Sequence, residues 1–123
     1  MTTSVLVIDD DPAFRHLAVR MLEGIGLSVV GEADTVEAAG EAARALRPEA
    51  ALVDVGLPDG SGVTLAVELA GLPWGPRIVL TSNDRGAVSE ELVRSSGAAA
   101  FIAKEDLAGS RLRALLTGRP RAE

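Results

Sequence analysis

The chain has 123 residues, of which 47% are hydrophobic and only 2% aromatic, so we expect one domain with an aliphatic core. The net charge of −6 argues against direct nucleic-acid binding, which needs a basic face. The absence of cysteine excludes disulfides and thiolate metal sites. The opening MTTSVLVIDDD indicates neither a signal peptide nor a membrane span, so we expect a soluble, cytoplasmic protein.

Short apolar runs predict the strands of a buried parallel sheet. Four of them are continuously apolar and too short for an isolated helix, which is typical of strands covered on both faces. The remaining run contains Ser28 and suits an edge strand. In chain order, the predicted strands are residues 5–8, 27–30, 50–53, 78–80 and 99–102.

Between these runs, apolar residues recur at steps of three and four, which predicts helices. Asp11 and Pro12 form an N-cap followed by proline at the first helical position. Thr35 and Ser61 are expected to cap the second and third helices, the second ending before Pro48. The predicted apolar stripe of the first helix is Phe14, Leu17, Ala18, Met21, Leu22 and Ile25.

The alternation of strands and helices predicts an α/β fold. We expect an open, doubly wound (βα)5 parallel sheet of five strands with helices on both faces. A fourth helix is predicted over about residues 85–95, and a last one covers the apolar positions of 107–116. Residues 1–118 then form one domain, and 119–123 form a polar C-terminal tail.

Chemically active side chains follow four of the predicted strands, at the sheet edge where such folds bind ligands. Asp9 and Asp10 follow the first strand, Asp54 the third, Thr81 the fourth and Lys104, the only lysine, the fifth. Two carboxylates about 4 Å apart repel by roughly 4 kcal/mol at an effective dielectric near 20. Three of them therefore need protonation or a hard cation, for which Mg²⁺ is expected and Mn²⁺ is the alternative.

Four segments, VLVIDDDPAFR, ALVDVGLPDGSG, IVLTSND and AAAFIAKEDL, resemble the signatures of response-regulator receiver domains in two-component signalling. The resemblance runs from about residue 4 to residue 116 and implies the strand order 2-1-3-4-5. It implies that Asp54 is the phosphoacceptor. The other implied site residues are Asp9, Asp10 and the Gly56 backbone carbonyl for the metal, Thr81 and Lys104 for the phosphate, and Thr81 and Phe101 for the switch.

The resemblance also implies a signalling switch that promotes only its own phosphorylation and dephosphorylation. The donor would be a sensor histidine kinase or a phosphotransfer protein. Phosphorylation would change the face formed by the fourth helix, fifth strand and fifth helix for an output domain or protein partner. A phosphorylation-dependent homodimer is also compatible with this reading.

Some positions depart from the family pattern, and two other functions stay open. Glu105 follows Lys104 where many receivers have proline, and Phe101 replaces the commoner tyrosine. One alternative is a phosphorylation-independent interaction module, although such modules usually lack an acidic, acceptor or lysine position. The other is a phosphoaspartate hydrolase, for which Asp9 and Asp11 provide Asp-x-Asp spacing, whereas we expect Asp11 to cap a helix. The sequence leaves open whether the chain acts alone or within a longer regulator.

Overall fold

The computed structural model describes residues 2–109 and 111–118, so the predicted tail at 119–123 lies outside the described residues. Its main feature is one five-stranded sheet in which all neighbouring strands are parallel. The order β2-β1-β3-β6-β7 corresponds to the predicted 2-1-3-4-5 order. The strands are β1 (Ser4–Ile8), β2 (Ser28–Ala33), β3 (Ala50–Asp54), β6 (Arg77–Ser82) and β7 (Ala100–Ala103). The predicted fold class is confirmed.

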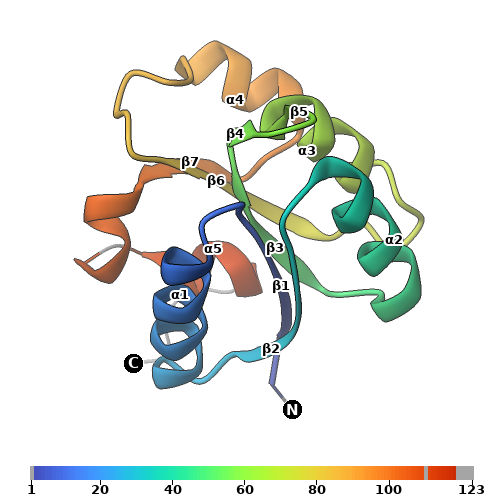
Figure 1. The fold of residues 1–123 in the computed structure, drawn as a ribbon, viewed down its shortest axis with the longest axis vertical. Helices are drawn as coiled ribbons and strands as arrows, with labels where there is room; N and C mark the ends of the chain where they lie inside the picture. The colour runs from blue at the N-terminus through green and yellow to red at the C-terminus, as the bar shows by residue number, and fades with distance from the viewer. Residues whose placement is uncertain (1, 110, 119–123) are drawn as a thin grey trace.

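Helices cover both faces of this sheet, with α1 and α5 on one side and α2 and α3 on the other (Figure 1). The α-helices are α1 (Pro12–Gly24), α2 (Val36–Leu46), α3 (Gly62–Ala70), α4 (Glu90–Ser96) and α5 (Leu112–Thr117). The predicted caps are confirmed: Asp11, Thr35 and Ser61 each accept a backbone N–H of the following helix. None of the helices in the described ranges is both long and apolar enough to cross a membrane.

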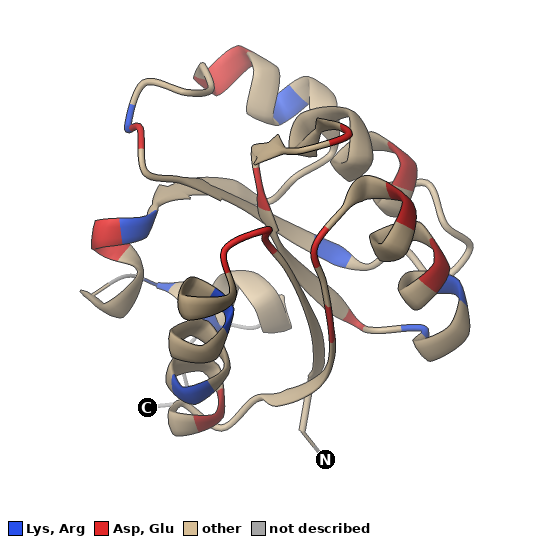
Figure 2. Ribbon diagram, in the orientation of Figure 1, with Lys and Arg blue, Asp and Glu red and all other residues tan. Residues whose placement is uncertain are grey.

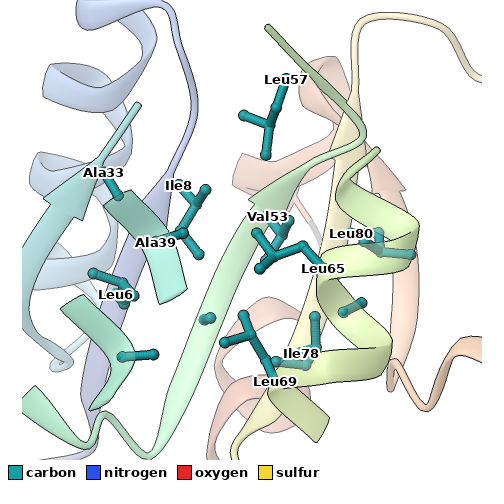
Figure 3. Packing of buried hydrophobic residues seen from close by; sticks show 13 residues of the cluster. Leu6, Ile8, Ala33, Ala39, Val53, Leu57, Leu65, Leu69, Ile78 and Leu80 are labelled. Atoms are coloured by element: carbon teal, nitrogen blue, oxygen red, sulfur yellow. The ribbon is translucent and has the colours of Figure 1, made fainter. Parts of the chain in front are cut away.

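The central strands contribute to two hydrophobic cores because successive side chains point to opposite faces of the sheet. One core lies against α2 and α3, and Figure 3 shows how its side chains converge from strands and helices. Its largest members are Leu6, Ile8, Val53, Leu57, Leu65, Leu69, Ile78 and Leu80. The other core lies against α1 and α5 and contains Val5, Val7, Leu22, Leu52, Val79, Leu112 and Leu116. With few aromatic residues available, both cores are built by close packing of aliphatic side chains.

The predicted start of the fourth helix is wrong, because α4 begins at Glu90 instead of near residue 85. Before it, the Asp84 carboxylate accepts the Gly86 N–H, and this local turn competes with helix formation. Ser89 is the actual N-cap and accepts the Leu92 N–H at 3.1 Å. Periodicity located the helix, whereas side-chain capping determined its boundary.

The predicted last helix is divided into two pieces. A 3-10 helix, η1 (Lys104–Gly109), is followed by α5, and Gly109 at the junction disfavours a continuous helix. Two positions of the predicted stripe on the first helix are also wrong, because Leu17 is 61% exposed and Ile25, the C-cap of α1, is 37% exposed. Only Ala18 and Leu22, four residues apart, are fully buried on that helix. The buried stripe of α1 is therefore narrower than predicted.

Candidate phosphorylation site

Three carboxylates meet at the carboxyl edge of the sheet. Oxygen atoms of Asp9, Asp10 and Asp54 all lie within 4.8 Å of one another, and Figure 2 shows the acidic segments that follow β1 and end β3 close together. Asp9 and Asp54 are buried, whereas Asp10 is exposed. The parallel sheet has therefore gathered groups that are 45 residues apart in the chain.

Burial and neighbouring charges both act on the carboxylate of Asp54. Burial first, and the charge of Asp9 second, raise the pKa of Asp54 from 3.8 to about 6, although Lys104 acts in the opposite direction. The combined effect of burial, Asp9 and Lys104 therefore disfavours the charged form of Asp54. A hard divalent cation fits this set of oxygen donors, because it would offset the remaining charge.

Lys104 is the cation that faces this cluster. Its Nζ lies 2.7 Å from Asp9 Oδ2 and 3.7 Å from Asp54 Oδ1, and its side chain is only 11% exposed. The contact with Asp9 has the distance of an ion pair, but Asp9 Oδ2 has no hydrogen bond of good geometry among the described residues. The ammonium is therefore held next to Asp54 without being tightly bound to it.

Thr81 lies directly beside Asp54 in the register of β3 and β6. It is 1% exposed, and its Oγ1 has no hydrogen-bond partner within the part of the chain that the structure describes. A buried polar group without a partner costs about 1–3 kcal/mol, so such groups are uncommon and call for a ligand or water. The hydroxyl could therefore donate a hydrogen bond to a ligand or a water molecule beside Asp54.

The two remaining predicted residues lie near this edge but in different environments. Gly56 is exposed two residues after Asp54, and a Cβ added there would meet nothing within 4 Å. The space at this position, two residues after Asp54, is therefore open. Phe101 on β7 pairs with Leu80 of β6, is half-buried and packs against the core under α2 and α3.

A short hairpin that the sequence did not predict follows Asp54. It consists of β4 (Gly56–Leu57) and β5 (Gly60–Ser61), and Asp59 lies in its turn. The Asp59 carboxylate accepts the Val36 N–H at 2.7 Å and the Glu37 N–H at 3.1 Å. The hairpin that carries Gly56 is thereby attached to the first turn of α2.

We expect Asp59→Ala to destabilise the protein at neutral pH and to have less effect in acid. The hydrogen bond from the Val36 N–H lowers the pKa of Asp59, so its stabilising contribution is present above the ordinary value and is lost as the pH falls. Urea unfolding of both proteins at pH 7 and pH 3 checks this expectation. A stability difference that does not shrink in acid would contradict it.

Two residues that support the site were not identified from the sequence. Arg15 on α1 donates from Nη1 to the backbone carbonyl of Asp9 at 2.7 Å and pairs through Nε with Glu32 at 3.1 Å. Gly62 begins α3 directly against the backbone carbonyl of Asp54. A glycine at the first turn of a predicted helix was the available signal for Gly62, whereas nothing in the sequence pattern indicated the partners of Arg15.

A comparison with protein families matches residues 5–116 to the response regulator receiver domain. The Mycobacterium tuberculosis protein named "Probable transcriptional regulatory protein NarL" is 39% identical over 116 residues, covering 91% of this chain and 52% of that protein. A protein-glutamate methylesterase/protein-glutamine glutaminase from Idiomarina loihiensis is 31% identical over 121 residues, covering 95% of this chain and 31% of that protein.

The comparison with solved structures agrees with the family match. The receiver domain of the NarL response regulator from Mycobacterium tuberculosis superposes with a TM-score of 0.77 at 31% identity, covering 95% of this chain and 92% of that one. The chain spans about half the length of the NarL relative and a third of the methylesterase. The similarity therefore concerns one domain of these longer proteins.

Proposed function

Because this chain belongs to the response regulator receiver domain family of two-component systems, we propose that it is a phosphorylation switch whose acceptor is Asp54. The observation that carries the proposal is the buried Thr81 hydroxyl, which lacks a partner among the described residues and lies beside Asp54. Lys104 and the acidic cluster occupy the same edge. A phosphoryl group on Asp54 would supply the acceptor atoms that this hydroxyl lacks.

The proposed step is the transfer of a phosphoryl group from a phosphohistidine to Asp54. A carboxylate oxygen of Asp54 attacks phosphorus, the phosphorus–nitrogen bond breaks, and its electron pair stays on the imidazole nitrogen. The product is an acyl phosphate on Asp54. Thr81 donates a hydrogen bond to one phosphoryl oxygen, and the ammonium of Lys104 stabilises the charge on another.

Asp9, Asp10, Asp54 and the backbone carbonyl of Gly56 are the proposed ligands of Mg²⁺, with Mn²⁺ as the alternative. When bound, the cation would offset the charge of the carboxylates and the phosphoryl oxygens. Arg15 keeps the backbone of Asp9 in place through its 2.7 Å hydrogen bond. The hairpin attached to α2 through Asp59 similarly orients the Gly56 peptide.

The output follows from the position of Thr81 between Asp54 and β7. We propose that movement of Thr81 and Phe101 changes the face formed by α4, β7 and α5, which an output domain, a protein partner or a second copy would read. The donor would be a sensor histidine kinase or a phosphotransfer protein. A cytoplasmic location is part of the proposal and agrees with the absence of cysteine.

Intact-mass measurement after incubation with acetyl phosphate and Mg²⁺ tests the proposal. The wild-type chain should gain one labile phosphoryl group, and the gain should disappear in Asp54→Asn and when EDTA is added. Asp34→Asn is the matched control, because it removes an exposed carboxylate directly after β2 and should leave the gain intact. No gain in wild type, with acetyl phosphate or a phosphorylated kinase, would favour the phosphorylation-independent interaction module.

A further inference from the structure

The aromatic ring of Phe14 lies directly against the ammonium of Lys104. The Lys104 Nζ is 4.2 Å from the centroid of the Phe14 ring, within the range of a cation–π contact. Phe14 belongs to the first turn of α1, which Asp11 and Pro12 begin at a fixed point after β1. The ring is half-buried and packs against the core under α1 and α5. Its position relative to the acidic cluster is therefore set by the fold.

We propose that Phe14 is a positioning residue that holds the Lys104 ammonium beside Asp54. The proposal rests on the phosphoacceptor function of Asp54. Besides the ring, Lys104 lies close to two carboxylates of the described residues, Asp9 at 2.7 Å and Asp54 at 3.7 Å. Both carboxylates are also candidate metal ligands. An aromatic face attracts the ammonium without binding a divalent cation through oxygen, so it can hold Lys104 when Asp9 has another partner.

The side chain of Lys104 needs such a restraint. Lysine has a flexible four-carbon stem, and its conformational freedom opposes a single placement of the ammonium. Because the side chain is only 11% exposed, water competes weakly for the charge, and the contact with the ring is stronger than at an open surface. Loss of the aromatic face should therefore leave Lys104 close to the site but less well placed for phosphoryl transfer.

The unique lysine makes this contact measurable by NMR. Lysine-selective ¹³C labelling gives one side-chain spin system, because Lys104 is the only lysine in the chain. The ε-methylene protons over the face of Phe14 should be shifted upfield by the ring current, both with and without Mg²⁺. Phe14→Leu should lose this shift, whereas Phe14→Tyr, which keeps an aromatic face, should retain it.

Phosphorylation rates with acetyl phosphate supply the second readout. We expect Phe14→Leu to be phosphorylated about 3- to 30-fold more slowly than wild type, and Phe14→Tyr to recover the rate, because cation–π contacts from exposed to desolvated sites span this range. Val19→Ala is the matched control, since Val19 is on the same helix and packs against the same core but has no aromatic ring to offer the ammonium. It should keep both the upfield shift and the rate.

Four results would overturn the proposal. The first is an unshifted Lys104 signal in wild type. The second is a wild-type rate in Phe14→Leu, and the third is a failure of Phe14→Tyr to restore the rate. The fourth is an equal slowing by Val19→Ala, which would make the effect one of packing. Failure of the proposed function is a separate result, because then the wild-type chain itself would gain no phosphoryl group.

Discussion

Replacing Gly62 with alanine is expected to lower the free energy of unfolding by about 3 kcal/mol or more, because overpacking against a rigid backbone is costly. An added Cβ would lie 2.0 Å from the carbonyl oxygen of Asp54 and 2.8 Å from Cα of Val55. Neither neighbour is a flexible side-chain end. The two segments are also joined by a hydrogen bond from the Gly62 N–H to the Val55 carbonyl at 2.8 Å.

Urea unfolding followed through the single tryptophan, Trp74, measures this effect. Gly24→Ala is the control, because Gly24 ends α1 with nothing within 4 Å of an added Cβ. Alanine is the better helix former by about 1 kcal/mol, so this control should be neutral or slightly stabilising. Equal stabilities of the two variants would contradict the close approach of α3 to the end of β3.

Asp54→Asn is expected to stabilise the metal-free protein at pH 8. Burial and the charge of Asp9 raise the pKa of Asp54 from 3.8 to about 6, so the folded state favours the protonated carboxyl. Its stabilising contribution is fully present below the unfolded value and is lost as the pH rises through about 6. At 1.36 kcal/mol per pKa unit, a shift of about two units corresponds to about 3 kcal/mol.

The asparagine variant keeps the ion pair of Lys104 with Asp9 at 2.7 Å, so little compensating attraction is lost. We therefore expect a gain of about 2–3 kcal/mol in the free energy of unfolding at pH 8 in EDTA, which should vanish below about pH 4. Glu68→Gln, which removes an exposed carboxylate on α3, should show no such change. A destabilised asparagine variant at pH 8 would show that the folded state does not disfavour the charged form of Asp54.

The sequence predicted the sheet and the site edge because both depend on local patterns. Asp9, Asp54 and Thr81 end or directly follow apolar runs, and a parallel sheet brings such positions together. The contact between Phe14 and Lys104 could not be predicted in this way. Helical periodicity indicates that Phe14 lies on an apolar face, but it does not identify the group that the ring meets across the fold.

The same limit explains the errors at the helix boundaries and at Leu17. The start of α4 depends on competition between the turn at Asp84 and the cap at Ser89, and both residue types favour a helix start or a turn. Leu17 belongs to the apolar pattern, but the face of α1 that meets the core is centred on Ala18 and Leu22, and periodicity alone does not show how wide that face is. The close approach of Gly62 to the Asp54 carbonyl could not be predicted from local patterns, since the two residues belong to different elements.

The strands of the sheet also differ in how tightly their side chains are packed, from β3 in the centre to β7 at the edge. All five residues of β3 are buried, so its side chains are locked by close packing on both faces. In β7, at the edge, three of four residues are only half-buried. A displacement that begins at Thr81 on β6 therefore meets a stiff neighbour on the side of β3 and a compliant one on the side of β7. In the proposed switch, a movement of Thr81 would therefore meet less resistance toward β7 than toward β3.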